Sequence, residues 1–246
     1  MVDIHCHNVP HVDDGAWDLD AAVEMARMAA DCGISRVIAT PHFTGVSESL
    51  EGLNRMIRQF RRLQSALKRE VPGLELIPGA EILCVPQTLE LARRGQLPTL
   101  GDSRYVLTEF YFDAPWEFMD STLSQLRRCG YWPVVAHPER YDAVQRDVSR
   151  AQSWFRRGYV IQVNKGSVLG AFGHRAEETA IRLLSRGCVH VIATDAHSPE
   201  VRTTDLSRVR LWLKEHFGRE YTQILLEDNP ERISRGMPMR SIDSGE

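Results

Sequence analysis

The chain contains very little lysine, since lysine supplies only three of its 30 basic residues and arginine the other 27. It also lacks an excess of charge of either sign, because 33 acidic residues leave a formal net charge of −3 at pH 7. A protein so close to neutral has no general attraction for nucleic acid or for an anionic membrane surface. The many arginines nevertheless supply planar guanidinium groups, which match the geometry of phosphate oxygens.

Cysteine is also scarce, and the five cysteines are widely spaced with no CxxC pair. An odd number without regular spacing does not indicate a disulfide framework. The N-terminus shows no basic segment followed by a long apolar run, as a signal peptide would. No stretch approaches the roughly 18 apolar residues of a membrane span. We therefore expect a reduced, cytoplasmic protein without a membrane span.

Several common catalytic motifs are absent from the sequence. It contains no GxSxG, Walker A or GxGxxG pattern, which removes support for a serine hydrolase, a P-loop protein or a Rossmann fold. A cysteine-dependent phosphatase loop needs an arginine six residues after the cysteine. The residues at that distance from the five cysteines are Val12, Ile38, Glu90, Val135 and Thr194.

Short apolar runs alternate with helix-length amphipathic segments along the whole chain. Several of the expected helices end at a glycine, which is a common stop signal. This alternation predicts parallel βα units, and seven units with Val- and Ile-rich strands favour a distorted (β/α)7 TIM-like barrel over an open sheet. We expect one domain over 1–246, with a short helix and a polar tail within 219–246. The expected strands are 2–7, 36–42, 74–82, 105–110, 132–137, 159–164 and 189–195, and the expected helices are 19–32, 48–70, 86–94, 117–130, 143–157, 174–187 and 204–217.

Every expected strand except the sixth ends near a side chain that metal ions favour. The C-terminal strand ends of a parallel barrel meet at one face, where active sites form. An isolated histidine at a strand end is typically a hydrogen-bonded surface residue, but such residues at six of seven strand ends favour a metal site. The expected ligands are His5, His7, Asp14, His42, Glu81, Glu109, His137, Asp195 and His197.

The segment His5–Cys6–His7 predicts the direction of its own side chains. Successive side chains of a strand point to opposite faces, so the two histidines share a face and Cys6 points away as a packing residue. In the following loop, Asp13 and Asp14 are equally spaced candidates for one ligand, and Gly15 permits a turn that returns either carboxylate. Asp3 and His11 have no such support, and His11 reads as a rim or surface residue.

The ligand types indicate the class of metal and of reaction. Mixed imidazole and carboxylate without thiolate suits manganese, iron, zinc or nickel more than magnesium or calcium alone. Eight or nine ligands exceed the needs of one ion, so we expect roughly two or three ions that share a carboxylate. Such a site suits phosphoester or amide hydrolysis. Arg140 and Arg202 follow His137 and His197 closely and favour phosphate, although a solvated surface role is the alternative for each.

These residues resemble a known family. The segments DIHCH, DDG, TPH, GAE, DSRYVLTEF, PVVAHPERYD, QVN and HVIATDAH are similar to those of the polymerase-and-histidinol-phosphatase (PHP) superfamily, and in particular to the CpsB/YwqE-like bacterial protein-tyrosine phosphatases. The resemblance covers roughly residues 1–235. It implies a distorted seven-stranded (β/α) barrel, which agrees with the strands expected above.

The resemblance also implies how the site is used. It implies a trinuclear centre, most often loaded with manganese, with Fe, Zn, Ni or Mg as alternatives, and phosphate held by Arg140 and Arg202. It implies as substrate the tyrosine-rich tail of a bacterial tyrosine autokinase that controls capsule or exopolysaccharide export. The implied ligand sets are His5, His7, Glu81 and Asp195 for one ion, Glu81, Glu109 and His137 for a second, and Asp14, His42 and His197 for a third.

Other functions remain open at this stage. A small-molecule phosphatase of the same superfamily, such as a histidinol-phosphate phosphatase, would use the same metals. An amidohydrolase is disfavoured because its bridging lysine would occupy the places of Glu81 and Glu109. A PHP barrel without turnover would usually have lost ligands, and a nucleic-acid role is disfavoured by the negative charge. Asn164 and Ser167 lie near the sixth strand without an assigned role, and the oligomeric state is not indicated.

Overall fold

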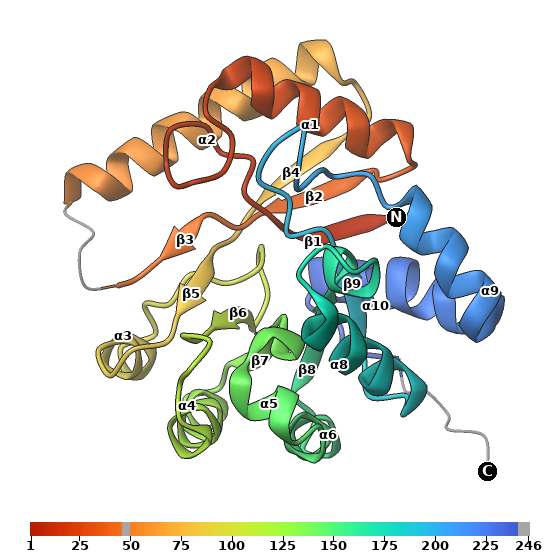
Figure 1. Cartoon of the computed structure of the whole chain (residues 1–246). Coiled ribbons are helices and arrows are strands. Elements are labelled where there is room, and N and C mark those ends of the chain that lie inside the picture. The colour runs from red at the N-terminus through yellow and green to blue at the C-terminus, as the bar shows by residue number, and fades with distance from the viewer. Residues whose placement is uncertain (46–49, 241–246) are drawn as a thin grey trace.

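A computed structural model describes residues 1–45 and 50–240 of the chain. Its strands converge toward the middle of the molecule and its helices lie around them (Figure 1). The strands are β1 (Val2–Cys6), β2 (Arg36–Ala39), β3 (His42–Phe43), β4 (Glu75–Pro78), β5 (Glu81–Leu83), β6 (Tyr105–Glu109), β7 (Trp132–Ala136), β8 (Val160–Asn164) and β9 (Val191–Ala193).

All strand pairs between the described residues are parallel. One sheet has the order β1-β2-β4, and the other has the order β3-β5-β6-β7-β8-β9. A parallel bridge between Cys6 and Ala196 joins β1 to the segment after β9. Helices connect the strands, as parallel pairing requires. The predicted α/β class with parallel strands is therefore confirmed, although the strands form two sheets rather than one continuous ladder.

Two of the predicted strands are each divided into two. The run 36–42 forms β2 and β3 with a break at Thr40–Pro41, and the run 74–82 forms β4 and β5 with a break at Gly79. Pro41 has no N–H to donate to a ladder. A Cβ on Gly79 would lie 2.8 Å from the side chain of Ile38, so the chains approach closely where both strands break. As a result, His42 and Glu81 begin β3 and β5 instead of ending longer strands.

Strand β1 contains a bulge that the alternation argument did not predict. Its register against β2 shifts between Asp3 and Cys6. Ile4 packs in a cluster formed by the inner side chains of six strands, whereas Cys6 packs in the larger cluster that includes helix residues such as Met25. Strict alternation would place Ile4 and Cys6 on one face. The bulge therefore lets Ile4 fill the strand-lined core and still directs His5 and His7 inward.

The helices follow the predicted pattern with several differences. The expected helix 143–157 is divided at Asp147, whose carboxylate accepts hydrogen bonds from the backbone N–H and the hydroxyl of Ser149. The start of the expected helix 48–70 and the end of the tail, at 48–49 and 241–246, lie outside the described residues. The helices are α1 (Leu19–Asp31), α2 (Leu50–Glu70), α3 (Thr88–Arg93), α4 (Trp116–Arg128), the 3-10 turn η1 (Pro138–Arg140), α5 (Asp142–Arg146), α6 (Ser149–Arg156), α7 (Lys165–Val168), α8 (His174–Ser185), α9 (Ser207–Gln223), the π-helical turn η2 (Ile224–Asp228) and α10 (Asn229–Ser234).

No helix within 1–45 and 50–240 combines the length and the apolar character needed to cross a membrane. The prediction that 1–246 forms a single domain stays a prediction.

Candidate metal centre

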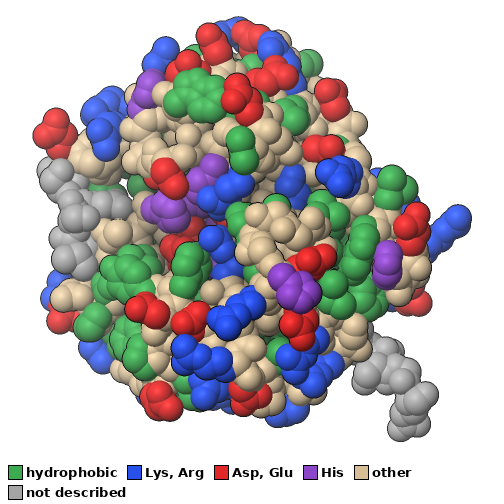
Figure 2. Space-filling view, viewed as in Figure 1, with side chains coloured by type: hydrophobic (Ala, Val, Ile, Leu, Met, Phe, Trp, Pro, Cys, Tyr) green, Lys and Arg blue, Asp and Glu red, His purple; other side chains and the backbone are tan. Residues whose placement is uncertain are grey.

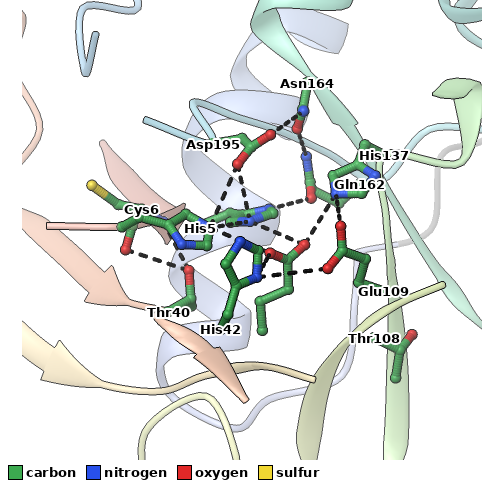
Figure 3. Close-up of polar contacts among 12 residues, drawn as sticks. His5, Cys6, Thr40, His42, Thr108, Glu109, His137, Gln162, Asn164 and Asp195 are labelled. Carbon is green, nitrogen blue, oxygen red and sulfur yellow. Dashed lines mark hydrogen bonds and ion pairs between the residues drawn. The ribbon is translucent and has the colours of Figure 1, made fainter. Parts of the chain in front are cut away.

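The predicted ligands gather at one place in the fold. Figure 2 shows histidine, acidic and basic side chains together near the centre of one face, and Figure 3 shows the inner members of the group pointing toward one another. A pocket of about 190 Å³ opens onto the group. The side chains brought together are those of His5, His7, Asp14, His42, Glu81, Glu109, His137, Asp195 and His197.

Glu81 lies at the centre of this group, and each of its oxygens faces two imidazoles. Its Oε1 lies 3.3 Å from Nε2 of His5 and 3.0 Å from Nε2 of His137. Its Oε2 lies 3.3 Å from Nε2 of His7 and 3.2 Å from Nδ1 of His42. Because the two oxygens face different partners, this carboxylate has the geometry of a bridge between neighbouring cations.

Two further groups lie on either side of Glu81. On one side, Glu109 approaches His42 and His137 at 3.6 Å each. On the other, Asp195 Oδ1 lies 3.3 Å from Nε2 of His5 and 3.6 Å from that of His7. The ligand atoms of His7, Asp14, His42 and His197 form another compact set, in which all lie within 4.8 Å of one another.

The structure separates the two candidate aspartates of the first loop. Asp14 Oδ1 lies 3.3 Å from Nε2 of His42 and 3.4 Å from Nε2 of His197, inside the group. Asp13 instead accepts hydrogen bonds from Nδ1 of His7 at 2.8 Å and from the backbone N–H of His42 and Gly15. Asp13 therefore orients a neighbouring imidazole, while Asp14 faces the open centre.

A chain of hydrogen bonds determines the tautomer of His5. The amide of Asn164 donates to Oδ2 of Asp195 at 2.5 Å, because a carboxylate only accepts, and its oxygen must then accept from Nε2 of Gln162. The remaining oxygen of Gln162 faces Nδ1 of His5 at 2.9 Å, so Nδ1 carries the proton. Figure 3 shows this chain from Asn164 to His5. In a neutral imidazole, Nε2 then presents a lone pair to the centre of the group.

The same logic applies to His7 and His197. The Asp13 carboxylate accepts a hydrogen bond from Nδ1–H of His7, and the backbone carbonyl of Asp195 faces Nδ1 of His197 at 3.1 Å. Nε2 of His5 and Nε2 of His7 lie only 3.2 Å apart, with both directed at carboxylate oxygens. Lone pairs of the imidazoles thus converge with carboxylate oxygens, which is the arrangement that a bound cation satisfies. The donor set fits divalent metal ions.

The pKa values of the histidines in this group also indicate that the carboxylates are stabilised by positive charge. Burial alone would lower the pKa of His5, but the carboxylates of Glu81 and Asp195 outweigh it and raise the value to about 9. Burial is likewise outweighed at His7, where Asp13 and Glu81 raise the pKa to about 10. At His197, burial and the nearby positive groups of His7 and Arg202 lower the pKa to about 4. Protons thus compete with cations at the first two imidazoles.

Both predicted arginines line the pocket and lie beside Asp195. Arg202 reaches Oδ2 of Asp195 at 2.5 Å, and Arg140 approaches the same oxygen at 3.6 Å. The guanidinium carbon of Arg140 lies over two aromatic rings, 4.4 Å from the centre of Phe112 and 4.5 Å from that of Phe172. These rings restrict its orientation, so its fork is held in place facing the pocket.

Backbone geometry at the site is unusual. His137 and Asp195 both have positive φ, at 34° and 50°, in the left-handed region that residues with a Cβ rarely adopt. Gly15 is required for space, because a Cβ there would lie 2.0 Å from the carbonyl oxygen of His7. The glycine thus allows the loop of Asp13 and Asp14 to lie directly against the end of β1.

The residues that support the ligands had no role in the sequence-based prediction, which named Asp3, Asn164 and Ser167 among them without a function. Gln162 and Asn164 are polar residues two apart in an otherwise apolar strand, and this spacing was the available signal. Glu139, which is fully buried, accepts hydrogen bonds from the backbone N–H of Asn164 and the hydroxyl of Ser167, and so ties η1 to the end of β8. Asp3, which had no assigned role, accepts from the backbone N–H and the hydroxyl of Thr194, next to Asp195.

Two predictions about residues outside the ligand set are confirmed. Cys6 lies among hydrophobic residues, and Figure 3 shows its sulfur directed away from the histidines. His11 is exposed at the surface of the first loop.

Comparisons with known proteins are consistent with this geometry. The family described as capsular polysaccharide synthesis, CpsB/CapC, matches residues 1–235. Tyrosine-protein phosphatase YwqE of Bacillus subtilis is 33% identical over 244 residues, covering 96% of this chain and 92% of the relative. Tyrosine-protein phosphatase CpsB of Streptococcus pneumoniae is 29% identical over 239 residues, covering 95% and 98%.

Solved structures also resemble this chain. A chain from the crystal structures of YwqE and CpsB, described as unique metal-dependent tyrosine phosphatases, superposes with a TM-score of 0.87 at 32% identity and covers 99% of this chain and all of that one. An organophosphorus hydrolase from Deinococcus radiodurans shares the fold alone, with a TM-score of 0.59 at 14% identity over 94% of this chain and 92% of that one. The chain belongs to the CpsB/CapC family of capsular polysaccharide synthesis proteins.

Proposed function

We propose that the protein is a metal-dependent phosphatase that hydrolyses phosphotyrosine in proteins. The observation that carries the proposal is that two arginines, Arg140 and Arg202, line the same pocket as a group of imidazoles and carboxylates whose lone pairs converge. Relatives that align over nearly the whole chain are named tyrosine-protein phosphatases, which supports the substrate class.

The ligand sets follow from the distances around Glu81. His5, His7 and Asp195 would hold one ion against Glu81, and His137 and Glu109 would hold a second against the same carboxylate. Asp14, His42 and His197 would hold a third. We propose manganese as the ion, with iron, zinc, nickel or magnesium as alternatives, since the donors are imidazole and carboxylate.

The bound ions and the residues of the chain would have separate roles in hydrolysis. Divalent ions bound here would supply Lewis-acid activation of a water molecule and neutralise phosphoryl charge. Arg140 and Arg202 would bind the phosphoryl oxygens and bind them more tightly as charge develops in the transition state. No side-chain nucleophile is needed, and Cys6 is buried away from the pocket. A tyrosyl oxygen leaves readily because the pKa of a phenol is about 10.

The physiological substrate that we propose is the tyrosine-rich tail of a bacterial tyrosine autokinase that controls capsule or exopolysaccharide synthesis. The description of the matching family as capsular polysaccharide synthesis supports this choice. We also propose a cytoplasmic location, where the five free cysteines would stay reduced.

A substrate survey tests the proposal. The metal-loaded protein should hydrolyse a phosphotyrosyl peptide with a higher kcat/KM than histidinol phosphate, and also higher than the matching phosphoseryl peptide. A higher value for histidinol phosphate would instead identify a small-molecule phosphatase. Absence of turnover with all three substrates by protein of verified metal content would contradict a phosphatase function.

A further inference from the structure

A second hollow, which we call the aryl groove, adjoins the metal pocket. It has a volume of about 390 Å³ and shares His42, Glu109 and Phe112 with the metal pocket. Among residues 1–45 and 50–240, its remaining lining comes from Thr44, Leu83, Phe110 and Tyr111, and none of these four carries a charge. A group attached to a phosphate in the metal pocket would therefore pass His42 and Glu109 and then reach the uncharged part of the groove.

The position of the aromatic residues defines the groove further. Tyr111 and Phe112 lie two and three residues beyond the end of β6, and they are 60% and 42% exposed, which is unusual for large aromatic residues. Phe112 lies 4.4 Å from the Arg140 guanidinium and 6.1 Å from the ring of His137. It thus lines both the metal pocket and the groove, beside the proposed phosphate-binding arginine.

The size and the chemistry of the aryl groove favour a phenyl ring as its occupant. A phenyl ring is flat and neutral and gains free energy when apolar surface leaves water, and it packs favourably against other aromatic rings. The alkyl stem of phosphoserine is too short to reach beyond the residues shared with the metal pocket, so it would gain little there. A charged leaving group would lose hydration without an ionic partner among the four remaining lining residues.

We infer that the aryl groove binds the phenyl ring of the substrate phosphotyrosine, and that Leu83 and Tyr111 contribute to the preference for aryl over alkyl phosphates. This inference rests on the proposed phosphatase function. It predicts that the groove contributes to binding of the ring itself, separately from the arginines and the ligand group that bind the phosphoryl oxygens.

Paired inhibitors isolate the contribution of the ring. Phenylphosphonate and methylphosphonate share the same anionic head, and neither is hydrolysed at phosphorus under assay conditions. In titration calorimetry, we expect the metal-loaded wild type to bind phenylphosphonate roughly tenfold or more tightly than methylphosphonate. A half-buried ring removes enough apolar surface from water to account for a difference of this size. Leu83→Trp, which fills the groove, should abolish this ratio while leaving the affinity for methylphosphonate unchanged.

Two control variants make the test specific. Leu211 is an exposed leucine on α9, so Leu211→Trp adds the same side chain far from the groove and should keep the wild-type ratio. Tyr111→Ala should lower the ratio about threefold or more without filling the groove, because it removes one apolar wall. The matching substitution Trp17→Ala removes an exposed aromatic that does not line the groove and should keep the ratio.

The outcomes separate the inference from the proposed function. If the wild type hydrolyses the phosphotyrosyl peptide but Leu83→Trp and Tyr111→Ala both keep the wild-type ratio, the groove does not bind the ring. A ratio that falls in Trp17→Ala instead would place the ring elsewhere and also overturn the inference. If Leu83→Trp does not fold, the affinity ratio of Tyr111→Ala alone tests whether the groove binds the ring. Failure of the wild type to turn over the phosphotyrosyl peptide would contradict the proposed function itself.

Discussion

The carboxylate of Asp13 accepts a hydrogen bond of 2.8 Å from Nδ1 of His7. This contact places the proton of the imidazole on Nδ1 and turns the lone pair of Nε2 toward Glu81. Outer carboxylates of this kind orient histidine ligands, and their loss typically lowers metal affinity about 10- to 100-fold. Asp13→Asn should therefore weaken metal binding to that extent without unfolding the protein.

Titration calorimetry with manganese measures this loss directly. Asp20→Asn, a change of the same kind at an exposed position of the first turn of α1, is the control and should bind as wild type does. An unchanged affinity in Asp13→Asn would show that the contact does not orient a metal ligand.

Cys6 provides the opposite case, because it lies between two proposed ligands in the sequence but is not one in space. Its side chain packs in the larger hydrophobic cluster. Cys6→Ser should retain most of the metal content and most of the turnover. It should lower the free energy of unfolding by about 1–3 kcal/mol, since a hydroxyl is placed in apolar surroundings. Loss of metal from a folded Cys6→Ser protein would show that the thiol is a ligand.

Much of this site was predictable from the sequence because its ligands are held by simple periodic elements. His5 and His7 are two apart on a strand, and Glu109, His137 and Asp195 lie at or just after strand ends. Each of these positions follows from residue spacing and from the parallel arrangement of the strands. The group could therefore be assembled before any contact between its members was known.

The remaining features of the fold and of the site depend on contacts that residue spacing does not encode. Asp13 and Asp14 are neighbours in one loop, and only their contacts in the fold show that Asp14 faces the ligand group while Asp13 bonds to His7. The bulge in β1 and the breaks beside Pro41 and Gly79 arise from tertiary packing against neighbouring strands. The Gln162–Asn164 pair gave a polar signal, but its partners come from β1 and from the segment after β9.

Arg140 is the residue whose loss should separate catalysis from metal binding. Arg140→Ala should lower kcat/KM for a phosphotyrosyl peptide by roughly two or more orders of magnitude, as loss of a charge-stabilising group typically does. Metal content should stay normal, because a guanidinium does not ligate a cation. Arg146→Ala, in the next helix and 78% exposed, is the matched control. Near-normal kcat/KM in Arg140→Ala would exclude Arg140 from transition-state binding.

The metal-free protein should lose stability as the pH rises. The carboxylates around His5 and His7 raise their pKa values in the folded state to about 9 and about 10, above the ordinary value of 6.5. A group with a raised folded pKa stabilises the fold fully below its unfolded pKa, and this contribution is lost as the pH rises through the folded value. The free energy of unfolding should fall between pH 6.5 and about 9, by up to about 1.4 kcal/mol per pH unit for each imidazole.

Urea unfolding of the metal-free and metal-loaded proteins over this pH range checks the expectation. The loaded protein should show a smaller decline, because bound imidazoles carry no proton to lose. Both forms contain the same buried thiols, whose raised pKa values affect the two profiles alike. Parallel profiles in the two forms would contradict the protonation of His5 and His7 in the empty site.

We propose that Glu81 joins the bound metal ions into one catalytic centre, and paired measurements of metal content and turnover test this role. Metal content and turnover of a phosphotyrosyl peptide are determined together for wild type and Glu81→Gln, before chelation, after chelation and after return of manganese. The wild type should hold roughly two or three ions per chain, and its turnover should be lost and restored with them. The Glu81→Gln protein should be folded but low in both metal content and turnover. Full turnover by the chelated wild type, or wild-type metal content and rate in Glu81→Gln, would contradict this role.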